Sequence, residues 1–228
     1  MKKQVVLFLF VLAVSLIVHG QQSPLDSLQA VKTRLLRTAT AADSVRIENL
    51  FVQKQKMLKQ RDKLQYPLIN AGPSSGVLPV KGIDEVPSPR RLYKLLFELT
   101  YSNPAPMADE VNAGLLEITR IINLHVAAGI PVQHIRPVIV VHAKALHSLG
   151  NDAAYQQHFN SPNPNSALVQ ELEQKAGARF IVCGQALQFL GYRKEQLLPG
   201  VKLALTAQVV LADYQLQGYV HYAIGESD

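Results

Sequence analysis

Short apolar segments alternate with longer amphipathic segments through most of the chain, and this alternation restricts the fold more than any other feature. The apolar segments are 93–99, 136–141, 179–183, 201–205 and 219–224. Helical periodicity marks 108–128, 166–176 and 207–216, and a short helix is expected from Gln185. Strands that are apolar on both faces are typical of parallel sheets covered by helices. We therefore predict an α/β fold, with a five-stranded, mainly parallel sheet and helices on both faces.

The first twenty residues have the parts of a signal peptide. Lys2 and Lys3 precede an apolar run over 5–18, and Val-His-Gly stands before Gln21. We expect residues 1–20 to be removed by cleavage after Gly20, which predicts a periplasmic or secreted protein. No second long apolar segment follows, so the sequence excludes a multi-span membrane protein and predicts no transmembrane segment after cleavage.

Residues 21–65 are expected to form a helical extension. Ser23 and Thr40 are each followed three positions later by a carboxylate, at Asp26 and Asp43, which is typical of helix starts. This segment contains nine Lys and Arg against four Asp and Glu, whereas the rest of the chain is nearly neutral. Its basic face is either solvated or directed toward an anionic surface or partner.

The remaining chain divides at a Pro- and Gly-rich stretch. Five prolines and three glycines fall between positions 66 and 89, so we predict a linker over 66–91 and an α/β domain over 92–228. A chain of this size can build a full core without disulfides or metals, and its single cysteine permits no internal disulfide. Low aromatic content and the near-neutral domain argue against nucleic-acid binding.

Cys183 is the main candidate for chemistry. In a parallel sheet, ligands bind beyond the carboxyl ends of the strands. The run Phe-Ile-Val-Cys-Gly-Gln over 180–185 places a thiol where a buried strand turns into a helix. Backbone N–H groups of Gly184 and Gln185 would favour the thiolate there. The alternative is a small cysteine buried in the core, because free cysteine is among the most buried residue types.

Three further residues at strand ends are candidates. His142 is a possible base or proton carrier for the thiol, with a hydrogen-bonded loop histidine as the alternative. Lys144 is expected to hold an anionic sulfur species by charge, and Thr206 to contribute to substrate binding after the fourth strand.

Several other kinds of site are not expected. The seven histidines include no pair four residues apart and no HExxH motif, so we predict no metal site. No GxxxxGK motif and no GxGxxG motif after a strand is present, and we predict no cofactor. The absence of a GxSxG motif removes the ordinary hydrolase interpretation.

Residues 76–222 resemble the DsrE/DsrF-like family. The matching stretches are EVNAGLLEITRIINLHVAAG (110–129), IVVHAKAL (139–146), NPNSALVQELEQKAGARFIVCGQAL (163–187) and LLPGVKLALTAQVVLADYQLQGYV (197–220). The resemblance implies a compact parallel α/β fold. In sulfur-relay members of the family, a cysteine at the end of the third strand carries sulfur as a persulfide, and Cys183 falls at that position. The sequence departs from the family at Ala143, where a glycine usually follows the histidine, and in its basic extension.

The resemblance and the residues together predict an exported DsrE-like protein that transfers sulfane sulfur through a persulfide on Cys183, as a sulfurtransferase or sulfur carrier. Expected partners are further copies of the chain and a sulfur donor or acceptor, either a protein or a small thiol. The alternative is a non-enzymatic oligomeric or small-ligand-binding module with a buried structural cysteine. Reaction of the native protein with a thiol reagent distinguishes the two.

Overall fold

Five parallel strands form one sheet in the computed structural model, which describes residues 24–225. The sheet order is β4-β3-β2-β1-β5. The strands are β1 (Tyr93–Leu99), β2 (Ile135–Val141), β3 (Arg179–Cys183), β4 (Lys202–Ala204) and β5 (Val220–Ile224). The predicted α/β fold and parallel sheet are confirmed. The predicted signal peptide, residues 1–20, lies outside the described residues.

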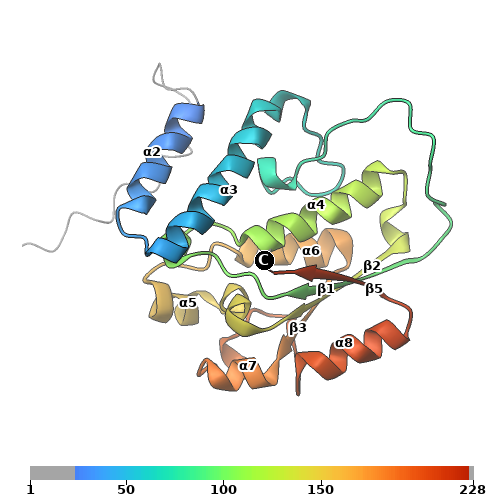
Figure 1. Cartoon of the computed structure of the whole chain (residues 1–228). Helices are drawn as coiled ribbons and strands as arrows, with labels where there is room; N and C mark the ends of the chain where they lie inside the picture. The colour runs from blue at the N-terminus through green and yellow to red at the C-terminus, as the bar shows by residue number, and fades with distance from the viewer. Residues whose placement is uncertain (1–23, 226–228) are drawn as a thin grey trace, which may run out of the picture.

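Helices cover both faces of this sheet (Figure 1). On one face, α4 (Ala113–Ala127) and α6 (Ser166–Ala176) pack on the larger core cluster, which includes Phe97 and Phe180. On the other face, α8 (Ala207–Leu216) covers a smaller cluster. Because side chains alternate along a strand, odd-numbered β1 residues such as Phe97 face α4, and even-numbered ones such as Leu96 face α8.

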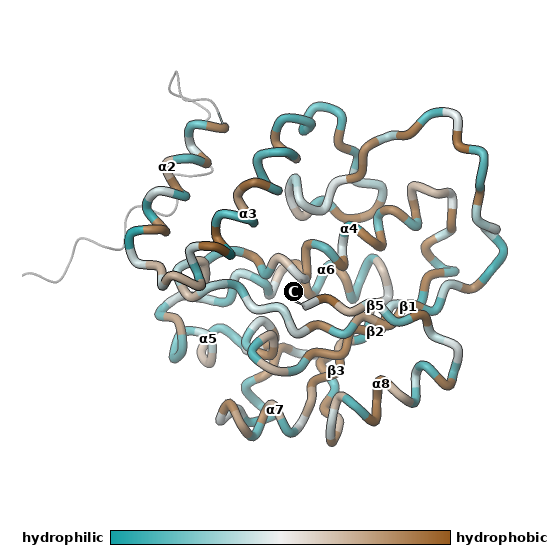
Figure 2. Tube along the Cα trace, viewed as in Figure 1, coloured by the Kyte–Doolittle hydropathy of each residue, from teal (hydrophilic) through white to brown (hydrophobic). Residues whose placement is uncertain are grey.

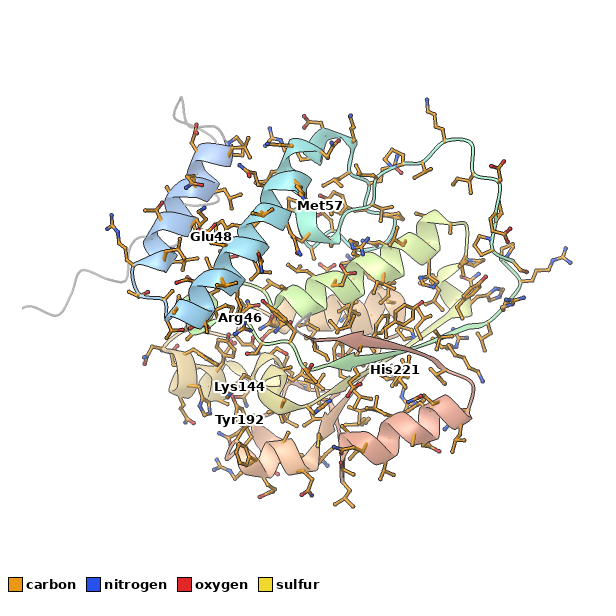
Figure 3. All side chains as sticks on the ribbon, viewed as in Figure 1. Arg46, Glu48, Met57, Lys144, Tyr192 and His221 are labelled. Atoms are coloured by element: carbon orange, nitrogen blue, oxygen red, sulfur yellow. The ribbon has the colours of Figure 1, made fainter. Side chains whose placement is uncertain are left out.

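The extension forms two helices, α2 (Pro24–Leu36) and α3 (Ala41–Lys59). Thr40 caps α3, since its hydroxyl accepts a hydrogen bond from the Asp43 N–H at 3.1 Å. The salt bridge between Lys32 and Glu48, 3.0 Å long, joins the two helices, and Figure 3 labels Glu48 between them. Their small core, Leu35, Ile47 and Phe51, reaches the domain through Met107.

Hydropathy follows this layering. Figure 2 shows hydrophobic residues along the central strands and an alternation of hydrophilic and hydrophobic residues along α2 and α3. No helix among residues 24–225 is long and apolar enough to cross a membrane.

The first half of segment 66–91 is anchored to the domain. Gln65 and Val77 form an antiparallel bridge, and Ile69 is 1% exposed. The Asn123 side chain on α4 accepts from the Ile69 N–H at 3.1 Å and donates to the Ile69 carbonyl at 2.8 Å. This part of the segment therefore contributes to the core, although its composition favours neither a helix nor a central strand.

The connections contain elements that the periodicity does not predict. α5 (Asp152–Phe159) and the 3-10 helix η5 (Ala143–Leu149) fill the β2–α6 connection. The short helix expected from Gln185 is present as α7 (Gly184–Phe189), directly after β3. The other 3-10 turns are η1 (Arg61–Lys63), η2 (Pro73–Ser75), η3 (Ala105–Met107), η4 (Val132–His134) and η6 (Lys194–Gln196). α4 begins five residues later than expected because Asn112 caps it, accepting from the N–H groups of Gly114 and Leu115.

Candidate functional site

Cys183 is the last residue of β3 and the N-cap residue of α7. Its side chain lies on the α8 face of the sheet, in the cluster that includes Ala207, Leu211 and Tyr214. The residue is 5% exposed. The thiol therefore stands at the predicted strand-to-helix junction, within the apolar cluster on the α8 face.

Gly184 and Gln185 pack against the end of β4. A Cβ atom on Gly184 would lie only 2.7 Å from the Ala204 carbonyl oxygen, so only glycine fits there without a shift of the backbone. The Gln185 Nε2 donates to the Leu205 carbonyl at 3.4 Å. These contacts fix the turn after Cys183. Thr206, at the start of α8, donates its hydroxyl hydrogen to the Gln208 side chain.

His142 stands beside Cys183 across the β2–β3 pair. The register pairs Val141 with Val182, so the next residues, His142 and Cys183, are opposite one another. The extended backbone of His142 continues the alternation of β2 and directs its side chain to the same face as Val140 and Cys183. Its backbone N–H donates to the Leu99 carbonyl at 3.1 Å, which extends the ladder by one residue.

A carboxylate from β1 binds the His142 ring. Glu98 Oε1 lies 2.9 Å from His142 Nε2, and Glu98 Oε2 lies 2.9 Å from His221 Nε2 on β5. The three side chains are 22 to 31% exposed, so the group is partly open to solvent. Figure 3 labels His221 on the α8 side of the sheet. Cys183, His142, Glu98 and His221 thus form one row across four neighbouring strands, which we call the sulfur-face row.

Glu98 and His221 are not among the residues that the sequence analysis singles out. A signal was present for Glu98, because a carboxylate interrupts the otherwise apolar run Leu-Leu-Phe-Glu-Leu of β1. Such a group in a buried strand is expected to have a partner. Within residues 24–225, no group of three or more His, Cys, Asp or Glu side chains is arranged to hold a metal ion.

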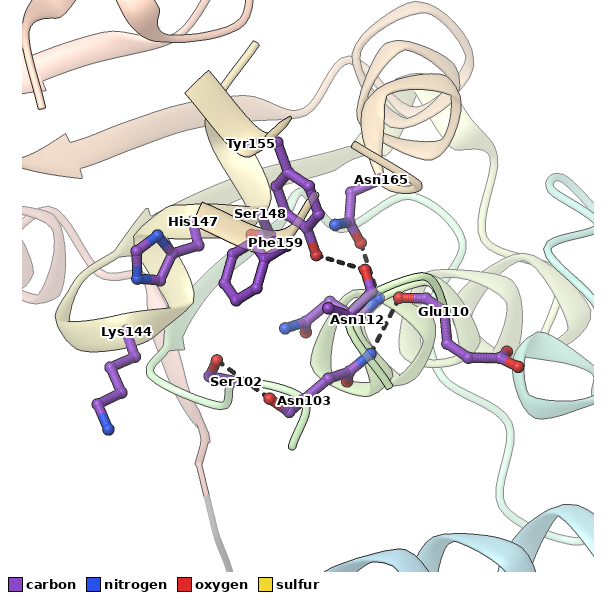
Figure 4. Close-up of a pocket in the computed structure, with 11 residues that line it drawn as sticks. Ser102, Asn103, Glu110, Asn112, Lys144, His147, Ser148, Tyr155, Phe159 and Asn165 are labelled. Atoms are coloured by element: carbon purple, nitrogen blue, oxygen red, sulfur yellow. Dashed lines mark hydrogen bonds between the residues drawn. The ribbon is translucent and has the colours of Figure 1, made fainter. Parts of the chain in front are cut away.

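Lys144 contributes to a different site from the sulfur-face row. It lines a small pocket at the carboxyl ends of β1 and β2, with a cavity volume of about 20 Å³. Figure 4 shows this pocket between the β1–α4 loop, η5 and α5, and its lining includes Ser102, Asn103, His147, Tyr155 and Asn165. A cavity of this size holds about one water-sized molecule. Cys183 is not among the residues that line this pocket. The expected role of Lys144 at the Cys183 sulfur stays a prediction.

An aromatic cluster forms one wall of the pocket. Tyr192 Oη lies 2.8 Å from His147 Nδ1, and burial, followed by the charges of His158 and Lys144, lowers the pKa of His147 to about 4. Burial also raises the pKa of Tyr192 and brings that of Tyr155 to about 12. His147 is thus neutral at pH 7, and its Nδ1 shares a hydrogen bond with the Tyr192 hydroxyl.

A larger groove, with a volume of about 940 Å³, runs between α3 and α4. Its lining combines apolar side chains such as Met57 and Leu116 with charged residues. Two of its cations are paired with groove carboxylates, Lys54 with Glu110 at 3.4 Å and Arg120 with Glu117 at 2.6 Å.

Comparison with known protein families identifies one family for most of the α/β domain. The model of the DsrE/DsrF-like family matches residues 100–221, more than half of the chain. The chain belongs to the DsrE/DsrF-like family. The predicted resemblance is therefore confirmed, and three members of the sulfur-face row, His142, Cys183 and His221, fall inside or at the end of the matched region.

One solved structure to which the chain is similar is that of a protein of unknown function from Methanobacterium thermoautotrophicum. The two sequences are 21% identical, and the match covers 57% of this DsrE-like chain and 98% of the other, with a TM-score of 0.44. No curated protein matches the chain.

Proposed function

We propose that this DsrE-like protein transfers sulfane sulfur through a persulfide on Cys183. The DsrE/DsrF-like fold is related to sulfur relay, which supports the general class of function. The observation that carries the specific proposal is the sulfur-face row. The thiol of Cys183 is opposite His142, and a carboxylate binds the far nitrogen of that imidazole. A nucleophile, a base and a group that orients the base are the parts that nucleophilic catalysis requires.

The proposed reaction exchanges one sulfur–sulfur bond for another. The Cys183 thiolate attacks the terminal sulfane sulfur of a polysulfide or of a donor persulfide. The new Sγ–S bond forms as the donor S–S bond breaks, and the donor leaves as a thiolate or a shortened polysulfide anion that takes up the proton lost by Cys183. An acceptor thiolate then attacks the outer sulfur, and Cys183 leaves as thiolate. Sulfur moves without net oxidation.

Burial of Cys183 favours a second candidate function. At 5% exposure among apolar neighbours, the cysteine can serve as a core residue of a non-enzymatic oligomeric module. Large apolar side chains are also exposed on and near α7 and α8, with Phe189 90%, Leu205 77% and Leu216 89% exposed. Such residues are typical of an association surface when they are contiguous.

Mass spectrometry of the native protein after treatment with inorganic polysulfide tests the first proposal. We expect added sulfur on Cys183, and none on the Cys183→Ser variant, because the chain has no other thiol. A small inorganic donor is the appropriate probe because the thiol is so little exposed. No adduct, together with no alkylation of the native wild type by a small thiol reagent, would favour the module with a structural cysteine.

Export and self-association belong to the same proposal. The basic and apolar segments of 1–20 support a periplasmic or secreted protein with cleavage after Gly20. N-terminal analysis of the protein recovered from its natural compartment should begin at Gln21, and a chain that retains Met1 would contradict export by cleavage. Light scattering of the mature protein should give a mass above that of one chain.

A further inference from the structure

The Glu98 carboxylate is shared between two histidines on neighbouring strands. His142 approaches Oε1 and His221 approaches Oε2, each through Nε2 at 2.9 Å. β1 lies between β2 and β5, and this order places the carboxylate between the two rings. Both oxygens therefore have an imidazole partner, which fixes the plane of the carboxylate.

This arrangement determines the tautomers of both rings. An ionised carboxylate only accepts hydrogen bonds, so each ring must present an Nε2–H to Glu98. In a neutral imidazole the other nitrogen then has the free lone pair. For His142 that nitrogen is Nδ1, which is thus available to take a proton.

His142 is also the ring opposite the thiol. Adjacent strands lie about 4.8 Å apart, and the side chains of His142 and Cys183 leave the same face at paired positions. This spacing makes the two side chains neighbours on one face, and proton transfer between them, direct or through one water, is part of the proposal.

We propose that Glu98 is a positioning residue that fixes His142 as the base for Cys183, and that His221 holds the second carboxylate oxygen so that Glu98 cannot rotate away. This inference rests on the proposed persulfide function and names the residues that would control its rate. When His142 takes the thiol proton, the adjacent carboxylate stabilises the imidazolium. The proton then returns to the departing donor.

Other titratable groups near the row come from three elements. Lys94, four residues before Glu98 on β1, donates to the Gln217 carbonyl at 2.8 Å. α8 contributes Asp213 and Tyr214, and Tyr219 packs on Tyr214. The carboxylate that contacts both rings is Glu98.

The tautomers can be measured without any sulfur chemistry. Nitrogen-15 NMR of the full chain should find His142 and His221 as Nε2–H when neutral. In Glu98→Gln the amide oxygen can accept from one ring only, and its NH₂ group must donate to the other, so one of the rings should change to Nδ1–H. His142 as Nδ1–H in the wild type would overturn the inference, whatever Cys183 does.

The rate of sulfur loading from inorganic polysulfide provides the functional test. Loss of the orienting carboxylate should slow loading of Glu98→Gln by about 10²–10⁴-fold near neutral pH, the usual size of general acid–base effects. Loading should still reach completion with excess donor, and its pH profile should change. Glu117→Gln is the matched control, because it removes a partly exposed carboxylate, paired with Arg120, from the α4 side of the sheet and should leave the rate unchanged.

The outcomes separate the two proposals. Wild-type protein that loads, with Glu98→Gln loading at the same rate and the same pH dependence, overturns the role of Glu98 and leaves the function of Cys183 intact. Wild-type protein that does not load overturns the proposed function itself. If Glu98→Gln does not fold by circular dichroism, Glu98→Asp replaces it, since its shorter carboxylate cannot reach both rings and should give an intermediate rate.

Discussion

Ala143 adopts a left-handed backbone conformation between the two candidate sites. Its φ is 52°, a region in which a side chain costs roughly 1–2 kcal/mol. Glycine avoids this cost but loses about 0.4–1 kcal/mol through the greater freedom of the unfolded chain. Ala143 therefore holds a backbone conformation to which glycine is better suited.

We expect Ala143→Gly to stabilise the fold by about 0.5–1 kcal/mol, the difference between these two effects. Urea unfolding followed by circular dichroism measures it. Ala212→Gly is the control, because Ala212 is exposed within α8, where glycine should destabilise by about 1 kcal/mol. Equal destabilisation by both substitutions would contradict the strain at Ala143.

His147 should make stability depend on pH. Its pKa is about 4 in the fold, below the ordinary value of 6.5. Between these values the unfolded chain binds a proton that the folded protein excludes, so the free energy of unfolding falls as the pH decreases from about 6.5 to about 4. The full shift corresponds to about 3 kcal/mol, and partial exposure of the ring reduces our expectation to about 1–2 kcal/mol.

Urea unfolding of the wild type and of His147→Gln at about pH 7 and about pH 4.5 tests this assignment. Glutamine can still form a hydrogen bond with the Tyr192 hydroxyl but does not titrate, so the variant should lose less stability on acidification. His134→Gln is the control, because that ring bonds only to the exposed Pro89 carbonyl among the contacts described. An unchanged pH dependence in His147→Gln would show that other groups are responsible.

At the residue scale, the sequence predicts part of the candidate site. Parallel strands end at the same edge of a sheet, so Cys183 and His142 could be expected there together. The partnership of Glu98 with His221 depends on β5 lying next to β1, and a pattern of apolar segments does not contain the strand order. The burial of Cys183 depends on where α8 packs, which is also a tertiary property.

At the element scale, strongly patterned segments form where periodicity predicts them. α6 and α8 have the predicted bounds, and β1 and β3 do as well. α5 was not predicted because only Ala154 and Tyr155 of its eight residues are buried, which leaves little periodic signal. The late start of α4 follows from side-chain capping by Asn112, which competes with continuation of the helix toward residue 108.

The N-cap of α3 provides a test of whether the extension is a stable part of the protein. Thr40→Ala removes the hydrogen bond to the Asp43 N–H and should destabilise α3 by about 1 kcal/mol. Thr33→Ala is the control, because the exposed Thr33 hydroxyl donates only to the Gln29 carbonyl within α2 and its loss should be nearly neutral. Hydrogen exchange of the α3 amides measures the effect of each substitution on the stability of α3. Equal protection in Thr40→Ala and wild type would contradict a stabilising cap.

At the scale of the whole molecule, the helical extension and the chain after Leu64 are held to the α/β domain by different contacts. α2 and α3 contact the domain through Met107, the ion pair of Lys54 with Glu110, and the Arg46 bond to the Ser102 carbonyl. The chain after Leu64 is held more firmly, because Ile69 is buried and hydrogen-bonded to Asn123. The structural division therefore lies near Leu64, before the Pro- and Gly-rich stretch.

This division predicts different results for two truncated chains. A chain that begins at Leu64 keeps Ile69 and should fold with a core close to that of the full protein. A chain that begins at Gly72 loses Ile69 and leaves the buried Asn123 side chain without three of its four hydrogen bonds, so it should be about 2–5 kcal/mol less stable than the first. Urea unfolding compares them. If both are equally stable, the anchor at Ile69 contributes nothing.

Light scattering of the chain that begins at Leu64 then tests what the extension does. The apolar stripes of α2 and α3 contact each other and Met107, yet Val45 and Val52 remain 63% and 48% exposed on α3. Exposed valines on α3 are available to a second copy of the chain. We expect the truncated chain to have a lower oligomeric mass than the mature protein. An unchanged mass would assign self-association to the domain, where Phe189, Leu205 and Leu216 are the exposed apolar side chains to substitute next.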